Sequence, residues 1–217
     1  FSSDQRRWEG GATFSLLYIC WMNYLAHAYF SYKDPELLVG NMISDFVKGK
    51  SKFGYPPRIL EGIMLHRSID GFTDLHPSTK IIKSLYRSSY GHYGGVFADV
   101  IYDHFLANDA SIFTEKELEE FSLWVYGTLD RYRLLLPERF QQMFLYMRRD
   151  NWLFHYREKW GIRKSFGGIV HRAKYLTESE TAFELFEAHY DELQNAYATF
   201  LPCLVEHLSQ HYPSIKP

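Results

Sequence analysis

Prolines divide this chain into segments with the pattern of α-helices. At four places a proline stands where the first turn of a helix favours it: Asp34-Pro35-Glu36, Pro56-Pro57, His76-Pro77-Ser78 and Leu136-Pro137-Glu138. Apolar residues then recur every three or four positions, as in Ile59, Ile63 and Met64. Leucine (24) outnumbers valine (7), and alternating apolar and polar runs are scarce. We therefore predict an all-α fold, a single helical domain of about seven to eight helices.

Three further predictions concern the boundaries of this domain and its helices. Residues 22–210 are expected to form the helical domain, and residues 1–21 an N-terminal extension outside the core fold, or a leader that packs poorly. The glycines from Gly161 to Gly168 predict a loop. Pro202 lies inside a C-terminal helical pattern, so we expect it to kink or end that helix.

Composition and charge exclude several classes of protein. The 217 residues are 46% hydrophobic and 23% charged, as in a folded globular protein, and the net charge of −2 argues against a nucleic-acid-binding role. The longest apolar run, Ala12 to Trp21, is about half of the roughly 20 residues that span a bilayer, so no membrane span is expected. Cys20 and Cys203 make no metal-binding or CxxC spacing, which excludes a disulfide framework and favours a reducing, cytoplasmic location.

Charge is segregated in the second half of the chain. The segment from Arg148 to Lys174 holds eight Lys or Arg residues against two acids, and Glu178 to Glu192 holds six acids and no Lys or Arg. The ordinary interpretation of each is a solvated helix face. Beside a site that handles phosphate, the basic segment would also suit docking of an acidic partner.

Familiar catalytic motifs are absent from the sequence. Gly49-Lys50-Ser51 imitates the end of a P-loop, but Ser44 stands where the earlier glycine is required. The chain has no HExxH and no Glu-x-x-His pair, so a di-iron bundle lacks its usual ligands.

What remains is a group of His and Asp residues on apolar helical segments. His66 and Asp70 are four apart and share a helix face, as do Asp99 and Asp103. Such groups are costly to bury unless they are paired or bind metal, and they suit a divalent ion such as Mn, Mg, Fe or Zn. The full group is His27, Asp45, His66, Asp70, Asp74, His76, Asp99, Asp103 and His104.

Each of these residues also has an ordinary structural explanation. His27 would suit a hydrogen-bonded core histidine, Asp70 and Asp74 could pair with Arg67, and His76 could begin a helix. Spacing alone therefore leads only to a candidate site for a metal-dependent hydrolase.

Four motifs in order resemble the acyl carrier protein phosphodiesterase family, from Met22 to about Leu208. They are Met22-Asn23-Tyr24-Leu25-Ala26-His27, Gly40-Asn41 through Ser44-Asp45-Phe46-Val47-Lys48-Gly49, Leu65-His66-Arg67-Ser68-Ile69-Asp70 with Phe72-Thr73-Asp74 and His76-Pro77, and Asp99 through Tyr102-Asp103-His104-Phe105-Leu106-Ala107. After Asn108 the similarity weakens, because Asp109 follows where the family pattern has tryptophan.

The resemblance implies an all-α fold related to the HD phosphohydrolases, with the helices in a non-standard order. The implied reaction hydrolyses the phosphodiester that joins 4′-phosphopantetheine to a serine of holo acyl carrier protein. It also implies a divalent metal, Mn²⁺ by preference, with Mg²⁺ or Fe²⁺ as alternatives.

The resemblance also implies roles for individual residues. The expected metal ligands are Asp45, His66, Asp70, Asp103 and His104. The expected catalytic residues are Asp70 as a proton acceptor, Arg67 and Lys48 against phosphoryl charge, and His27 toward the leaving group. Asp74, His76 and Asp99 are expected to orient the ligands.

Because carrier proteins are small and acidic, the basic segment becomes a hypothetical docking surface, represented by Arg148, Arg149, Arg163 and Lys164. Two alternatives stay open: an HD-type phosphohydrolase acting on a nucleotide or other small phosphodiester, and a non-catalytic helical adaptor that binds carrier proteins. The sequence does not give the oligomeric state.

Overall fold

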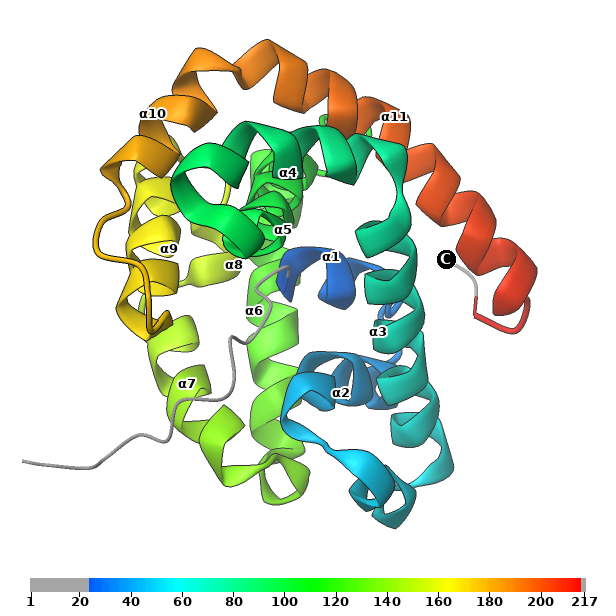
Figure 1. The fold of residues 1–217 in the computed structure, drawn as a ribbon. Coiled ribbons are helices and arrows are strands. Elements are labelled where there is room, and N and C mark those ends of the chain that lie inside the picture. The colour runs from blue at the N-terminus through cyan, green and yellow to red at the C-terminus, as the bar shows by residue number, and fades with distance from the viewer. Residues whose placement is uncertain (1–23, 216–217) are drawn as a thin grey trace, which may run out of the picture.

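The structure, a computed structural model, describes residues 24–215. This part of the chain forms α-helices joined by short turns, with no strand among the described residues (Figure 1). The helices are α1 (Tyr24–Tyr29), α2 (Pro35–Ile43), α3 (Pro57–Leu75), α4 (Pro77–Tyr90), α5 (Gly94–Ala107), α6 (Glu115–Arg131), α7 (Glu138–Arg149), α8 (Trp152–His155), α9 (Lys159–Arg172), α10 (Glu180–Ala188) and α11 (Tyr190–His211). Four 3₁₀ turns are η1 (Ser44–Phe46), η2 (Gly49–Gly54), η3 (Gly91–Tyr93) and η4 (Arg133–Leu135). The all-α prediction is confirmed.

The predicted prolines begin helices. Pro35, Pro57 and Pro77 are the first residues of α2, α3 and α4, where a missing N–H costs no intrahelical bond. The side chain of Asp34 caps α2 by accepting hydrogen bonds from the backbone N–H groups of Glu36 and Leu37, both at 3.0 Å. Local sequence is therefore enough to start these helices.

Helix α5 is the centre of the core. All of its residues from Gly94 to Ala107 are buried, and the helix lies in the middle of the molecule, surrounded by others (Figure 1). When a helix is buried on all sides, its polar side chains can find hydrogen-bond or charge partners only inside the protein. Asp99, Asp103 and His104 on this helix are therefore expected to have internal partners.

Helices α2 and α3 cross at a pair of glycines. A Cβ atom at Gly40 would lie 2.0 Å from the carbonyl oxygen of Ile59, and one at Gly62 would lie 2.3 Å from that of Leu37. Only glycine allows so close a backbone approach. The crossing brings α2 against the helix that carries His66 and Asp70.

Two predictions about the helices are wrong, and one of the two outcomes expected at Pro202 is excluded. The described residues form eleven α-helices rather than seven or eight, because short helices such as α1 and α8 are separated by tight turns. Residues Gly161 to Gly168 lie inside α9, where Gly161 lets the helix approach the carbonyl of His155; a Cβ there would be 2.0 Å from that oxygen. Pro202 does not end α11, which continues to His211 and curves over the top and side of the molecule (Figure 1).

No helix within residues 24–215 is long and apolar enough to cross a bilayer. The predicted extension, residues 1–21, lies outside the described residues.

Candidate metal centre

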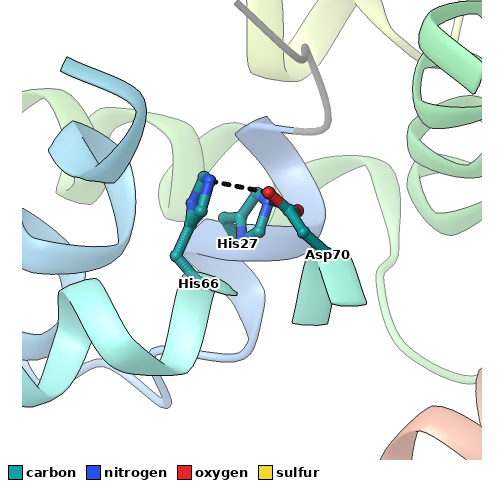
Figure 2. A group of neighbouring side chains, drawn as sticks. All are labelled: His27, His66 and Asp70. Carbon is teal, nitrogen blue, oxygen red and sulfur yellow. Dashed lines mark ion pairs between the residues drawn. The ribbon is translucent and has the colours of Figure 1, made fainter. Parts of the chain in front are cut away.

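Three side chains from two helices converge at one place. His27 lies on α1, and His66 and Asp70 lie one turn apart on α3. One ligand atom from each side chain lies within 4.8 Å of the other two, and Figure 2 shows the carboxylate of Asp70 facing the two imidazole rings. The rings are stacked, with centroids 3.8 Å apart. The predicted i,i+4 pair is therefore joined by a third residue from a distant part of the sequence.

Asp45 completes this group from the turn η1. Its Oδ1 atom lies 3.2 Å from Nε2 of His66, and Oδ2 of Asp70 lies 3.1 Å from the same nitrogen. The two histidines are almost fully buried, at 1% and 2% exposure, whereas the side chains of Asp45 and Asp70 are 18% and 27% exposed. The carboxylates thus form the side of the cluster that solvent or a substrate can reach.

Asn41 fixes the orientation of both rings. Its Nδ2 donates to the backbone carbonyl of His27 at 2.7 Å, so its Oδ1 must be the atom that faces Nδ1 of His27, at 2.8 Å. Nδ1 of His27 therefore donates to Asn41. Nδ1 of His66 donates to the backbone carbonyl of Asn41 at 2.7 Å. Both Nε2 atoms consequently point toward the carboxylates, an orientation typical of metal-binding histidines.

The electrostatics of the cluster are strongly coupled. Burial disfavours a charge on His66, but the carboxylates of Asp70 and Asp45 outweigh it and raise the pKa of His66 to about 10. Burial alone would raise the pKa of Asp70, but the charge of His66 holds it well below its usual range. Burial and the charge of His66 lower the pKa of His27 despite its neighbouring carboxylates. The cluster therefore favours a charge on His66 and disfavours one on His27.

The environment of His27 fits a metal ion. Because Nδ1 carries the proton, Nε2 offers a lone pair, and this buried atom has no hydrogen-bond partner among the described residues. It lies 3.2 Å from Oδ1 of Asp70, another electron-pair donor. Two acceptors at this distance repel each other unless a proton or a metal ion lies between them. His27, His66 and Asp70, with Asp45 beside them, therefore form a donor set suited to a divalent metal.

The predicted ligand Asp103 is not one of the three converging side chains, and both of its oxygens are engaged by backbone groups. Its two oxygens accept hydrogen bonds from the backbone N–H groups of Leu25 and Ala26, both at 2.9 Å. These N–H groups belong to the first turn of α1, where no intrahelical partner exists. Burial raises the pKa of Asp103, and the two N–H groups oppose the rise. Asp103 therefore holds the helix that carries His27.

His104, also predicted as a ligand, has both ring nitrogens engaged elsewhere. Nδ1 lies 2.8 Å from the carbonyl oxygen of Tyr156, and Nε2 lies 2.9 Å from the hydroxyl of Tyr190. Burial and the charge of Lys159 lower the pKa of His104 to about 4, against the hydrogen bond to Tyr156. The ring is a neutral core group that links α5 to the chain around α8 and α11.

Two of the residues expected to orient the ligands have other contacts. Asp74 forms an ion pair with Lys83 at 2.7 Å, and Nδ1 of His76 accepts from the N–H of Ser78 at 3.2 Å, at the start of α4. Asp99 is different. It is 5% exposed, and its Oδ2 has no hydrogen-bond partner among the described residues. Burial, followed by the charges of Asp70, Asp74 and Asp103, raises its pKa well above the usual range.

The two basic residues expected to face phosphate lie at the edge of the cluster. Arg67 follows His66 directly, and its Nη2 donates to the carbonyl oxygen of Val47 at 3.0 Å. Lys48 is exposed, immediately after Val47. Arg67 thus ties the turn containing Asp45 to α3.

The basic segment from Arg148 to Lys174 is largely neutralised by its neighbours. Six of its eight Lys and Arg residues form ion pairs with acids. The pairs are Arg148 with Asp130, Arg149 and Lys164 with Asp150, Arg157 with Glu115, Lys159 with Glu187, and Arg163 with Glu180. The segment is therefore strongly basic when read along the sequence, but in the folded protein most of its positive charges lie beside a negative charge.

Asn41 and Ser31 were not predicted as part of the site. Ser31 Oγ donates to the carbonyl oxygen of His27 and lies 3.2 Å from Nδ2 of Asn41. Asn41 is the polar residue of the buried run Leu37–Ile43, and a buried amide requires partners. That single polar position is the sequence signal that could have identified it.

Comparison with known proteins connects this site to a family. The family model described as acyl carrier protein phosphodiesterase matches residues 22–204. A protein of that name from Yersinia pestis is 31% identical over 191 residues, which cover 88% of this chain and 98% of the relative. One from Enterobacter sp. (strain 638) is 31% identical over 83% of this chain and 94% of the relative.

No solved structure matches the chain, so the relation to the HD phosphohydrolases stays a prediction. The family model covers the helices and the four motifs around the metal centre, from α1 to most of α11. This chain belongs to the acyl carrier protein phosphodiesterase family.

Proposed function

We propose that this protein hydrolyses the phosphodiester between 4′-phosphopantetheine and a serine of holo acyl carrier protein, using a divalent metal ion, Mn²⁺ by preference. The observation that carries the proposal is the convergence of His27, His66 and Asp70 within 4.8 Å, in a chain of this family. The products are the apo carrier protein and free 4′-phosphopantetheine. The free thiol of Cys203 agrees with a cytoplasmic location.

In this proposal His27 and His66 would hold the metal through Nε2, together with Asp70. When bound, such an ion polarises a phosphoryl oxygen and lowers the pKa of water. Asp45 is the base: its Oδ1 adjoins His66, and its side chain is partly exposed, so it can accept the proton of an attacking water. Lys48 offsets the negative charge that develops on the phosphoryl oxygens.

The test uses metal-stripped protein, restored with Mn²⁺ and incubated with holo carrier protein. Intact-mass spectrometry should show the carrier losing the phosphopantetheinyl group. His66→Ala and Asp70→Asn should abolish this loss and the stoichiometric binding of Mn²⁺. Glu61→Gln serves as the control on α3, because Glu61 pairs with Arg58 at 2.7 Å, outside the metal group.

A panel of nucleotides and small phosphodiesters tests the nearest alternative. Turnover of a nucleotide with no change in the holo carrier would reject the proposed substrate. A protein that binds carrier but neither Mn²⁺ nor phosphodiesters would be an adaptor instead.

A further inference from the structure

A basic loop begins three residues after Asp45 of the metal centre. Between Asp45 and Glu61 the chain holds four basic residues and no acid, namely Lys48, Lys50, Lys52 and Arg58. Residues 48–53 of this stretch, which include most of η2, are called the basic loop below. Neither the metal centre nor the hydrolysis step uses Lys50, Lys52 or Phe53.

Contacts with α3 fix the loop beside the site. At its start, the carbonyl oxygen of Val47 accepts from Arg67, the residue after His66. Further along, Nζ of Lys52 lies 3.3 Å from the sulfur of Met64, two residues before His66. The loop is therefore held to α3 at two points, by Arg67 at its start near Asp45 and by Met64 further along.

The charges of the loop are available to a partner. Lys50 is exposed, and no acid pairs with it among residues 24–215. Lys52 contacts the sulfur of Met64 and lies 5.2 Å from the ring of Phe53, neither of which cancels its charge. Arg58, just beyond the loop, is in contrast neutralised by Asp34 and Glu61.

Phe53 adds an apolar contact at the tip of the loop. Its side chain is 66% exposed. An exposed aromatic ring surrounded by positive charge has the composition of a protein-binding surface, where an aromatic residue is buried on association and charges steer the encounter.

The chemistry of the proposed substrate requires the docking surface to adjoin the site. The bond to be broken is attached directly to a serine of the carrier, and a serine side chain is short. The carrier must therefore rest against the rim of the metal centre while the bond is cleaved. The basic loop begins three residues after Asp45, a partly exposed member of the cluster, whereas α9, which carries Arg163 and Lys164, lies on the opposite side of the molecule from α3 (Figure 1).

We propose that the basic loop, with Lys50 and Lys52 as its charges and Phe53 as its apolar anchor, is the surface on which an acidic carrier protein docks. This inference rests on the proposed function, since it names the partner surface for the same reaction. We prefer the basic loop to the segment from Arg148 to Lys174 as the docking surface, because the charges of that segment are mostly paired within the chain.

The test compares Lys50→Glu/Lys52→Glu and Phe53→Ala with a matched control, Arg163→Glu/Lys164→Glu. Each is assayed with holo carrier protein and with bis(p-nitrophenyl) phosphate, which needs no docking. The loop variants should raise KM for the carrier about tenfold or more, while turnover of the small phosphodiester stays at the wild-type level. The control should change neither KM nor turnover.

Binding is measured separately, by fluorescence anisotropy of labelled apo carrier protein at low and moderate salt. Wild-type affinity should fall as salt rises, and the double loop variant should bind weakly with little salt dependence. This arm does not require catalysis, so an inactive protein would overturn the proposed function without removing the test of docking. Wild-type affinity in the loop variants, equal losses in loop and control variants, or loss of the small-substrate activity would each overturn the docking surface.

Discussion

Nδ1 of His27 donates a hydrogen bond to Oδ1 of Asn41, 2.8 Å away, and this contact determines which nitrogen of the ring can bind metal. The orientation of the amide is fixed independently, because its Nδ2 donates to the carbonyl oxygen of His27. The same residue accepts from Nδ1 of His66 through its own carbonyl oxygen. One asparagine on α2 therefore directs Nε2 of both histidines toward the carboxylates.

Replacing Asn41 should weaken metal binding without removing a ligand. In Asn41→Ala, Nδ1 of His27 loses its acceptor, so the ring is free to turn or to move its proton to Nε2. We expect affinity for Mn²⁺ to fall about 10- to 100-fold, as measured by isothermal titration calorimetry. Ser31→Ala removes only one contact of Asn41 and should have a smaller effect. Equal affinities for wild type and Asn41→Ala would show that Asn41 does not set the orientation.

Asp103 should behave as an anchor for α1 rather than as a ligand. Asp103→Asn replaces one acceptor of the Leu25 and Ala26 N–H groups with a donor, so one buried N–H loses its partner. We expect a loss of about 1–3 kcal/mol in the free energy of unfolding, with Mn²⁺ still binding in the same stoichiometry at saturation. Urea unfolding and metal analysis measure the two quantities. Loss of stoichiometric metal from folded Asp103→Asn would restore Asp103 to the ligand set.

The glycine crossing should be intolerant of even one methyl group. Gly62→Ala would place a Cβ 2.3 Å from the carbonyl oxygen of Leu37, which forces α2 and α3 apart. We expect a loss of at least about 2 kcal/mol, together with weaker metal binding, because Asn41 moves relative to His66. Gly127→Ala is the control: its Cβ would meet nothing within 4 Å, so removing a glycine from α6 should stabilise the protein by about 0.5–1 kcal/mol. Similar unfolding curves for the two variants would contradict the close crossing.

His104 should make the protein less stable in mild acid. Its pKa is about 4 in the fold against 6.5 when unfolded, so between these values the unfolded chain binds the proton and the folded chain does not. Stability is therefore lost as pH falls through 6.5, by about 2 kcal/mol from this residue between pH 7.5 and 5.

The measurement is the difference between wild type and His104→Gln in chemical unfolding at those two pH values. Glutamine removes the titration, so the variant should lose less stability than the wild type on acidification. Identical pH dependence would mean that the fold does not shift the pKa of His104.

Local patterns were sufficient for the all-α class, for the start of several helices and for the His66 and Asp70 pair of the metal centre. Prolines in the first turn and apolar spacing located α2, α3 and α4, and the i,i+4 spacing of His66 and Asp70 put both on one face of a helix. The loop predicted at Gly161 to Gly168 is wrong, and Pro202 does not end α11, because both residues are tolerated in a helix when its surroundings accommodate them.

The roles of Asp103 and His104 could not be assigned from spacing. Both lie on the buried helix α5, and their adjacency resembles that of a metal-binding pair. In the fold, Asp103 meets the start of α1, and His104 meets Tyr156 and Tyr190. Those contacts join residues more than 50 positions apart, which no local pattern specifies.

The amino-acid sequence by itself determined the helical class and the pairing of His66 with Asp70, because both depend on spacing within a few turns. It also determined the family, through four motifs in a fixed order. Only the tertiary structure decided which other groups join them. The close crossing of α2 and α3 brings Asn41 to both rings, and the contact of Asp103 with α1 places His27 against His66. Packing also decided where positive charge stays available, since ion pairs cancel most of the long basic segment and leave the short loop beside the site uncancelled.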